Sequence, residues 1–385
     1  MRTSGLALIA ILACAPWNLS AQSFVAQSPQ FTSARLSAIG GMHAALADDI
    51  TTLFSNPAGF QSAGPQFSIS EASVHLAGPV FSIANLLGRV AGSSNPAAIV
   101  TDPSVVALFT NLYASAALNG PISLGYVGNG LGFGFFNSTG VTLSTVGAIP
   151  TINAAAQESL MFVGGYSFAI PLPEQSRSTL DLGLSIKLFA TGTVRLSQDV
   201  LSLISLFSSG GFSSLLNQPL NLDIGVGLDT GVLYSWDKTI SAGIVARNLY
   251  TPVARSQVPA SGAPVTYGTV PIDLSTGVMY SPHPVWLEPY VTGLKIMVDY
   301  SDILDFLTHP STASNPILHV GAGVELTILR ILALRAGLDD GYLSAGIGLN
   351  LTAFQLDFAM YGSELSLEPG LHPVYNLSLG LEFRY

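Results

Sequence analysis

Residues 376–385, NLSLGLEFRY, carry the pattern that decides the fold. The odd-numbered side chains are large and apolar, and they are Leu377, Leu379, Leu381, Phe383 and Tyr385. The even-numbered positions are polar, charged or glycine, and they are Asn376, Ser378, Gly380, Glu382 and Arg384. Because successive side chains of a β-strand point to opposite faces of the sheet, this stretch predicts a strand with one apolar face and one face of polar residues and glycine.

The same alternation recurs at 181–188, 222–229, 318–327 and 343–350. In each stretch the charged residues share one face, and glycine is frequent on that face. A soluble β-sandwich also alternates, but we expect its solvent face to carry lysines and glutamates rather than glycine. The apolar faces therefore predict contact with lipid, and the glycines predict an inward face that leaves room in a lumen for something else.

The composition agrees with a membrane protein that lacks spanning helices. Of the 385 residues, 49% are hydrophobic and 9% are charged, whereas soluble domains average roughly 25% charged residues. After residue 21, every apolar stretch is interrupted before it reaches the ~20 residues that a spanning helix needs. A closed β-barrel is the other structure that satisfies its backbone hydrogen bonds within a bilayer. We therefore expect an all-β protein, a transmembrane antiparallel β-barrel in a bacterial outer membrane.

We expect about fourteen strands, an even number as bacterial barrels require. Their predicted ranges are 65–75, 121–128, 130–138, 157–170, 178–190, 221–235, 238–249, 271–281, 289–300, 316–327, 330–338, 341–350, 353–361 and 374–385. The connections between them alternate between short and long, except at the tight turn Asp339-Asp340. Short periplasmic turns and long external loops are the rule in such barrels. The pattern predicts a barrel over 65–385 with both termini in the periplasm.

Residues 1–21 have the features of a secretory signal peptide: a basic start at Arg2, an apolar stretch at 5–13 and a small residue, Ala21, before the cleavage site. An alternative interpretation places a lipoprotein cleavage site before Cys14. Cys14 is the only cysteine in the chain, so cleavage after Ala21 leaves no thiol for a disulfide or a metal. With 13 basic and 23 acidic residues, nucleic acid is excluded as a partner.

Residues 22–64 do not alternate, and they predict a separate N-terminal unit. Small residues dominate between 34 and 60, and three short motifs follow one another. These motifs are Gly40-Gly41, Asp48-Asp49 and Asn56-Pro57-Ala58-Gly59. Their order resembles the N-terminal hatch of the FadL family of outer-membrane transporters. The resemblance implies a hatch that plugs the lumen and opens a path for hydrophobic molecules by moving. A plain turn before the first strand is the alternative interpretation of Asn56-Pro57.

Two branches of that family share the order of motifs. The spirochaetal FadL-like proteins are the most similar overall, through stretches such as 319–325 and 332–337. The PorV-like proteins share the hatch motifs but serve protein secretion. The resemblance covers the hatch and the C-terminal part of the chain and is weak across 76–220. The aromatic end at Tyr385 resembles the C-terminal signal of the barrel-assembly machinery, which makes that machinery an expected partner during biogenesis.

Two long external connections are more apolar than exposure to water explains. Asp102-Pro103 is a good helix start, and the apolar residues that follow at helical spacing are Val105, Leu108, Phe109 and Leu112. In the second connection, Ser197 or Asp199 would cap a helix whose apolar face holds Val200, Leu203, Ile204 and Phe207. Either the two helices pack on each other over the barrel mouth, or they form a groove for a hydrophobic ligand. The resemblance implies that such loop helices capture acyl chains.

Basic residues on the predicted lumen faces are candidates for the polar end of a ligand. Lys187, Arg247 and Arg335 could bind a carboxylate head group. The alternative is that they pair with lumenal acids, for which the sequence offers Asp223, Asp229, Glu325 and Asp357.

The sequence gives no indication of catalysis, a metal site or a cofactor. Asp229-Thr230-Gly231 matches the aspartic-protease tripeptide, but such catalysis needs two carboxylates that share a proton. Gly321-Ala322-Gly323 lies in a predicted strand that no helix follows, so it is not a phosphate loop. The six histidines are scattered without metal-ligand spacing. We expect no catalytic residue and no bound metal.

The leading functional hypothesis is passive uptake of long-chain fatty acids or other hydrophobic small molecules through a barrel that the hatch gates. Burial of apolar surface, about 0.8 kcal/mol for each methylene, would drive the transfer without an energy source. A PorV-like barrel that holds an exported protein and an open structural porin are the alternatives. In each of them the surrounding partner is outer-membrane lipid.

Overall fold

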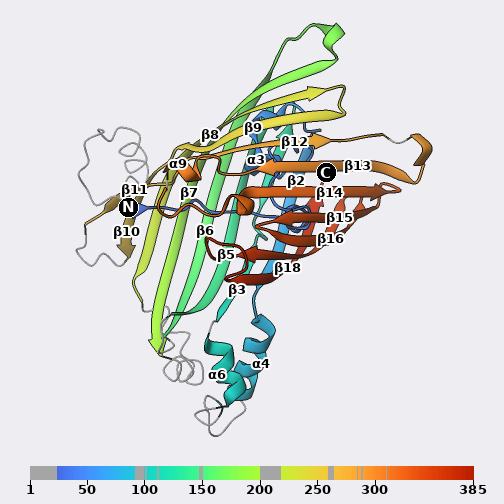
Figure 1. Ribbon diagram of the computed structural model, residues 1–385. Helices are drawn as coiled ribbons and strands as arrows, with labels where there is room; N and C mark the ends of the chain where they lie inside the picture. Colours follow the sequence, from blue (N-terminus) through green and yellow to red (C-terminus); the bar gives the residue numbers. More distant parts are fainter. Residues whose placement is uncertain are drawn as a thin grey trace.

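The structure is a computed structural model of the chain, and it describes residues 24–91, 99, 102–110, 112–146, 151–199, 218–258, 264–283, 285–287, 289–308 and 310–385. Within these residues the protein is all-β, with a closed antiparallel barrel and few helices (Figure 1). No helix in the described part of the chain is long and apolar enough to cross a membrane. The predicted signal peptide, residues 1–21, lies outside the described residues.

The strands follow one another along the chain. They are β1 (Phe24–Val25), β2 (Gln66–Ala77), β3 (Tyr113–Asn119), β4 (Leu124–Gly128), β5 (Leu131–Val146), β6 (Thr151–Ile170), β7 (Ser178–Asp199), β8 (Leu220–Trp236), β9 (Ile240–Tyr250), β10 (Pro252–Val258), β11 (Thr266–Thr269), β12 (Asp273–Tyr280), β13 (Val291–Tyr300), β14 (Val320–Ile328), β15 (Leu332–Asp339), β16 (Tyr342–Leu351), β17 (Phe354–Glu364) and β18 (Pro373–Arg384).

The helices are short and lie before the first wall strand or between strands. The α-helices are α2 (Ala34–Ala38), α3 (Thr52–Ser55), α4 (Val80–Ala91), α6 (Pro103–Thr110) and α9 (Asp305–Thr308). The 3-10 helices are η1 (Pro57–Phe60), η2 (Glu174–Ser176), η3 (Val285–Leu287) and η4 (Pro316–His319).

Hydrogen bonds between neighbouring strands close the wall on itself, because the last strand, β18, pairs with β2. Three wall strands are interrupted and carry two labels each: β3 with β4, β9 with β10, and β11 with β12. The described residues thus form a wall of fourteen antiparallel strands. This confirms the predicted fold class and number of strands. The short β1 pairs with β11 in parallel and is not part of that wall.

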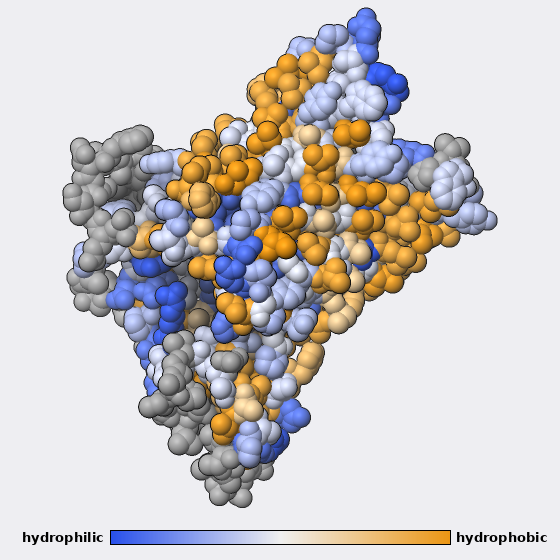
Figure 2. Space-filling model, in the orientation of Figure 1, coloured by the Kyte–Doolittle hydropathy of each residue, from blue (hydrophilic) through white to orange (hydrophobic). Residues whose placement is uncertain are grey.

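The alternation of side chains separates an apolar outer surface from a polar interior. On β7, Leu184 and Ile186 are 49% and 50% exposed, whereas the neighbouring Ser185 and Lys187 are buried. On β18, Leu379 is exposed and Ser378 is buried. Figure 2 shows the hydrophobic residues as a broad band over the strands. An outward apolar band around a polar lumen is the arrangement that a barrel needs in lipid.

Several strands are longer than the sequence analysis predicted. β6 begins at Thr151 rather than at residue 157, and β7 continues to Asp199 rather than ending at 190. The extra residues are mostly small or polar, so they continue the strands without the apolar alternation that marks a strand in the sequence. Ser197 does not cap a helix, because residues 198 and 199 continue β7. The predicted helix after Asp199 lies outside the described residues.

The connections differ between the two ends of the barrel. Those at one end, here called the turn end, include the tight turns at 129–130 and 237–239, whereas those at the other, the loop end, include 78–112 and 200–219. Tyr385 pairs with Phe67 at the turn end, and Phe24 pairs with Gly268 near the loop end. Figure 1 accordingly shows the two marked ends of the chain far apart. Phe24, the first described residue, thus lies near the loop end and Tyr385 at the turn end, and the periplasmic position of both termini stays a prediction.

The chain crosses the lumen between these two points. Residues 24–64, here called the N-terminal segment, run inside the wall from the loop end to the start of β2 at the turn end (Figure 1). Helix α2 packs against β15–β18, and η1 packs against β5–β8 on the other side. Because the segment contacts opposite sides of the wall, an open porin lumen does not fit the structure.

Glycines on the inner face of the wall make room for this segment. A Cβ added at Gly183 would lie 2.2 Å from the backbone nitrogen of Ala58, and one added at Gly243 would lie 2.1 Å from the carbonyl oxygen of Ala44. No side chain fits at such distances. The inward glycines thus leave room for the backbone of the N-terminal segment.

We expect Gly183→Val and Gly243→Val to displace the N-terminal segment while the wall still closes, because the new side chains would occupy the place of its backbone. Gly140→Val is the matched control, since a Cβ there lies 3.8 Å from its nearest neighbours. Limited proteolysis of the refolded proteins measures the effect. The segment should be cleaved in the first two variants and protected in the control, and equal protection in all three would contradict the role of the glycines.

Candidate functional site

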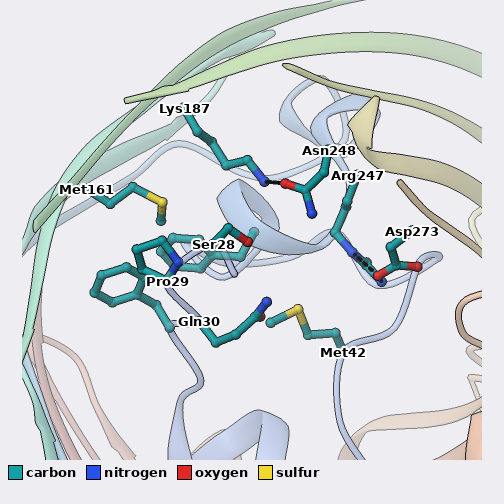
Figure 3. Close-up of a pocket in the computed structure, with 11 residues that line it drawn as sticks. Ser28, Pro29, Gln30, Met42, Met161, Lys187, Arg247, Asn248 and Asp273 are labelled. Carbon is teal, nitrogen blue, oxygen red and sulfur yellow. Dashed lines mark hydrogen bonds and ion pairs between the residues drawn. The ribbon is translucent and has the colours of Figure 1, made fainter. Parts of the chain in front are cut away.

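A cavity of about 80 Å³ lies between the N-terminal segment and the wall. We call it the lumenal cavity, and Figure 3 shows the side chains around it. Its apolar lining comes from Phe31, Met42, Phe54 and Met161. Methionine side chains are flexible and polarizable, and phenylalanine rings offer a large apolar surface, so both can contact an apolar ligand.

Two of the three predicted head-group residues, Lys187 and Arg247, also line the lumenal cavity. Lys187 Nζ lies 2.9 Å from Asp229 Oδ2 and donates to Asn248 at 3.0 Å. Arg247 Nη2 lies 2.6 Å from Asp273 Oδ2. The structure thus brings both cations to one cavity, and each already has a carboxylate partner, which is the pairing that the sequence left as the alternative.

Three aromatic rings separate the lumenal cavity from a smaller one beside β3. The ring centroids of Phe31 and Phe54 are 5.7 Å apart, and those of Phe54 and Phe136 are 4.7 Å apart. Phe31 and Phe54 line both cavities. The two rings that divide the interior therefore belong to the N-terminal segment, so movement of the segment would join the two spaces.

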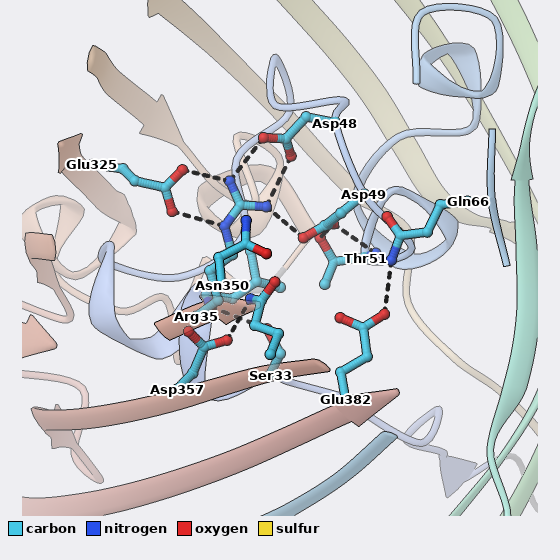
Figure 4. Close-up of polar contacts among 12 residues, drawn as sticks. Ser33, Arg35, Asp48, Asp49, Thr51, Gln66, Glu325, Asn350, Asp357 and Glu382 are labelled. Carbon is cyan, nitrogen blue, oxygen red and sulfur yellow. Dashed lines mark hydrogen bonds and ion pairs between the residues drawn. The ribbon is translucent and has the colours of Figure 1, made fainter. Parts of the chain in front are cut away.

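The Asp48-Asp49 motif meets a buried arginine of the same segment (Figure 4). Ser33 caps α2 by accepting a hydrogen bond from the backbone N–H of Leu36 at 3.2 Å, and this helix carries Arg35. Arg35 Nη2 lies 2.8 Å from Asp48 Oδ2, and Arg35 Nη1 pairs with Asp49. Arg35 is 6% exposed, so these charges interact with little screening by water.

The same arginine binds the wall. Arg35 donates to Glu325 of β14 at 2.8 Å, and Glu325 also accepts from Arg335 of β15 at 2.7 Å. Lys295 lies 3.1 Å from Glu325, and Arg335 lies 2.5 Å from Asp357. Arg335, the third predicted head-group residue, is thus held between two carboxylates and lies outside the lumenal cavity. We call these residues the charge cluster: Arg35, Asp48, Asp49, Lys295, Glu325, Arg335 and Asp357.

The charge cluster keeps Asp48 ionised. Burial by itself would raise the pKa of Asp48, but the positive charges of Arg35 and Lys295 outweigh burial and hold this pKa well below its usual range. The carboxylate therefore stays charged at neutral pH and continues to fix the segment to the wall. Removal of one partner from such a buried pair typically costs about 3–5 kcal/mol, because the other charge stays buried without compensation.

Gly40-Gly41 forms the turn that follows α2. The two residues have φ values of +83° and +95°, a region that side chains rarely adopt. A Cβ on Gly40 would also lie 2.3 Å from the carbonyl oxygen of Ala322 in β14. Both constraints require glycine, so the motif positions the segment closely against the wall.

Asn56-Pro57-Ala58-Gly59 is more than a turn before the first strand. Asn56 Oδ1 accepts from the backbone N–H of Ala58 at 3.0 Å, while its Nδ2 donates to the carbonyl oxygens of Ala44 at 2.8 Å and Val232 at 3.3 Å. The asparagine thus joins two parts of the segment to β8. Gly59 packs against Thr52, since a Cβ there would lie 2.5 Å from the Thr52 Cγ2 atom.

The sequence analysis missed a buried histidine–aspartate pair. His43 is fully buried, its Nδ1 lies 2.5 Å from Asp299 Oδ2, and the backbone N–H of Ala44 donates to Asp299 Oδ1 at 2.7 Å. In the sequence, this pair is indicated only by the position of Asp299, which faces inward on its predicted strand. Only the path of the segment brings His43 to it.

The external loop residues divide into two groups. Val105, Phe109 and Leu112 are buried in a cluster with residues of α4, β6 and β7, and Leu108 packs against that cluster. The long β6 and β7 supply a packing surface that the sequence analysis had assigned to loops. Packing therefore accounts for these side chains. The second group, Val200, Leu203, Ile204 and Phe207, lies outside the described residues.

The described residues contain no group of three or more histidine, cysteine or acidic side chains that could hold a metal ion.

We expect Arg35→Leu to release the N-terminal segment from the wall, because Asp48, Asp49 and Glu325 would lose their shared partner. The expected loss of stability is about 3–5 kcal/mol. Arg177→Leu is the matched control, since Arg177 pairs with Asp237 on the surface and an exposed pair contributes about 0–1 kcal/mol. Hydrogen exchange of residues 34–60 measures the release. Unchanged protection in the Arg35 variant would show that packing alone retains the segment.

The similarity of this chain to known proteins lies in its fold rather than in its sequence. The sequence matches no protein-family model and no curated protein sequence. Two similar solved structures are the TodX monoaromatic hydrocarbon channel deltaS2 mutant, with a TM-score of 0.52, and its deltaS2S3 mutant, with a TM-score of 0.50. Each of the two is 14% identical to this chain, and each match covers 92% of this chain. The matches cover 99% of the deltaS2 mutant and 98% of the deltaS2S3 mutant. A Pseudomonas aeruginosa FadL homologue is also similar, with a TM-score of 0.44 and 10% identity over 93% of this chain and 98% of that one. At these identities the two TodX structures establish a shared fold.

Proposed function

We propose that the chain is an outer-membrane channel for hydrophobic small molecules, with the N-terminal segment as its movable hatch. The observation that carries the proposal is the lumenal cavity, which has both apolar and polar lining residues and is bounded by that segment on one side and by the wall on the other. The apolar outer band of the barrel supports a place in the membrane. The structures of similar fold include proteins described as monoaromatic hydrocarbon channels.

The size of the cavity supports a hatch that must move. An apolar cavity of roughly 150 Å³ holds one benzene molecule, whereas the lumenal cavity measures about 80 Å³. Even a small ligand therefore needs more space than the present arrangement offers. Phe31 and Phe54, which belong to the segment, line this cavity, so a shift of the segment would enlarge it without a change in the wall.

Long-chain fatty acids are the finer hypothesis, in which Lys187 or Arg247 receives the carboxylate. Such a ligand would have to replace Asp229 or Asp273 and leave that acid without its partner, which is costly at a site of low exposure. A neutral hydrophobic molecule needs no such exchange. We therefore propose neutral molecules as the preferred ligands.

A disulfide that fixes the segment to the wall tests the hatch. A Cβ on Gly380 would lie 3.2 Å from Ala34 Cβ, close to the ~3.5–4.5 Å of disulfide Cβ pairs. In Ala34→Cys/Gly380→Cys, we expect uptake of naphthalene into proteoliposomes to stop when the pair is oxidised and to return on reduction.

The matched control for the hatch test joins two wall strands instead. A Cβ on Gly140 would lie 3.8 Å from Ala117 Cβ, so Ala117→Cys/Gly140→Cys cross-links β5 to β3. Uptake by this variant should be independent of oxidation. Equal uptake by the oxidised and reduced forms of the segment-to-wall variant would refute a moving hatch. Absence of uptake by the wild type would refute the channel itself.

The choice between neutral and acidic ligands depends on Asp273. We expect Asp273→Asn to free Arg247 and to increase binding of a fluorescent fatty acid by about tenfold, the effect of one additional ion pair of ~1.4 kcal/mol. Naphthalene binding should stay unchanged. Tight fatty-acid binding by the wild type, weakened by Arg247→Met, would instead establish the fatty-acid hypothesis.

A further inference from the structure

His43 of the N-terminal segment is enclosed against the wall together with its partner Asp299. The histidine is fully buried, and Asp299 of β13 is 6% exposed. Two inward glycines make the space for the pair. A Cβ on Gly323 of β14 would lie 3.0 Å from His43 Nε2, and one on Gly277 of β12 would overlap Asp299 Oδ1. The wall is thus shaped around an ionisable pair that the proposed channel function does not use.

The acceptors on both sides of the His43 ring decide how many protons the pair holds. His43 Nε2 lies 2.8 Å from the carbonyl oxygen of Ile39. This oxygen can only accept, so Nε2 carries a proton. His43 Nδ1 lies 2.5 Å from Asp299 Oδ2. Without a second proton, the lone pair of Nδ1 would face a carboxylate oxygen at this distance, which is repulsive. The contact between His43 and Asp299 therefore holds a proton of its own, on Nδ1 or on Oδ2.

Asp299 connects this proton to the rest of the segment. Its Oδ1 accepts from the backbone N–H of Ala44 at 2.7 Å, and the carbonyl oxygen of Ala44 accepts from Asn56 Nδ2 at 2.8 Å. Asn56 also donates to the carbonyl oxygen of Val232 in β8 at 3.3 Å. A chain of hydrogen bonds thus runs from β13 through the middle of the segment to β8. Repulsion between His43 and Asp299 would loosen the start of this chain.

The surroundings offer no base that could replace the proton. Among the described residues, Asp299 has no hydrogen bond or ion pair with a lysine or an arginine. The other charged side chains of the segment and of β9 and β12–β15 are acids or bases that already have acidic partners. They are Arg35, Asp48, Asp49, Lys295, Glu325 and Arg335 of the charge cluster, the paired Arg247 and Asp273, and Asp339, whose carboxylate approaches Gly41.

The charge cluster does not respond to pH in the same range. Arg35 and Arg335 stay charged because a guanidinium is not deprotonated in proteins, and Asp48 stays ionised beside them. The part of the segment that Arg35 holds is therefore fixed at neutral and at mildly alkaline pH. Histidine is the side chain whose ordinary titration falls within roughly pH 5–8. The contact of His43 with Asp299 is thus the pH-sensitive attachment of the segment.

We infer that His43 and Asp299 form a proton-dependent latch, which holds residues 43–44 against β13 while the pair keeps its proton and releases them when the proton is lost. The direction of the effect follows from the number of protons. The attached pair holds one proton more than a released neutral imidazole and carboxylate, so rising pH favours release. The effect of the latch on transport rests on the proposed channel function, but its effect on the segment does not.

Hydrogen exchange at the Ala44 amide, which donates to Asp299, tests the latch on the full chain in lipid nanodiscs. The rates are measured from about pH 7 to about pH 9, above the ordinary titration of histidine, and are corrected for the intrinsic pH dependence of exchange. We expect the protection of this amide to fall by up to about tenfold for each pH unit, the slope of one proton. Residues 35–38, which the charge cluster holds, should show no such slope.

Two variants keep the contact but remove its proton. In His43→Gln the new amide can donate to Asp299, and in Asp299→Asn the new amide can donate to His43 Nδ1. Protection of the Ala44 amide should then be independent of pH in both variants. His319→Gln is the matched control, because it changes a histidine–aspartate pair in the connection between β13 and β14, where His319 Nε2 lies 3.3 Å from Asp305 Oδ2. This control should keep the slope of the wild type.

The outcomes separate the latch from the channel. No slope at Ala44 in the wild type, or an equal slope in His43→Gln and Asp299→Asn, overturns the latch. A slope in the wild type and in His319→Gln that the two pair variants lack supports the latch, even if the wild type transports nothing. If His43→Gln does not fold, Asp299→Asn decides alone. Faster naphthalene uptake at alkaline pH by the wild type, but not by the pair variants, supports a role of the latch in opening, and uptake by the wild type that is independent of pH overturns that role.

Discussion

The arrangement of this protein depends on close contact between the backbone of the N-terminal segment and inward glycines of the wall. A fourteen-strand wall encloses space that the N-terminal segment fills, because glycines on its inner face leave room for that segment. Gly183 and Gly243 let the segment approach to distances that no Cβ permits. This packing gives the segment its path from the loop end to the turn end. Along that path the segment bounds the lumenal cavity, brings Phe54 against Phe136 of the wall and buries Arg35.

The charge cluster adds specificity to that packing. Dispersion between backbone and glycine has little directional preference, whereas Arg35 must meet Asp48 of its own segment and Glu325 of the wall in one geometry. Buried ion pairs contribute little net stability compared with apolar packing but are costly to break. The cluster thus favours one register of the segment and makes displacement of Arg35 from all its partners unfavourable.

The sequence predicts the strands of the wall better than it predicts the contacts inside the lumen. The period of two along β7 and β18 fixes the inner and outer faces, and the order of fourteen strands followed from it. Strand ends such as Thr151 and Asp199 escaped prediction because mostly small and polar residues continue these strands without apolar alternation. The pairing of His43 with Asp299 joins residues far apart in the chain. No local pattern records which acid pairs with which base inside the lumen, so Lys187, Arg247 and Arg335 could be named but their partners could not be assigned.

The energies of ligand burial and of release of the N-terminal segment are of similar size, so the proposed channel would need no energy source. A ligand of about seven carbons gains roughly 5–6 kcal/mol on complete burial. Release of one buried ion pair costs about 3–5 kcal/mol, so ligand burial could compensate for a local shift of the segment but not for loss of the whole charge cluster. A shift that moves Phe31, Ala34 and Phe54 and breaks at most one of the ion pairs of Arg35 meets this limit. The lumenal cavity lies beside those two rings, and the ligand would therefore act on the part of the segment that is free of the strongest contacts.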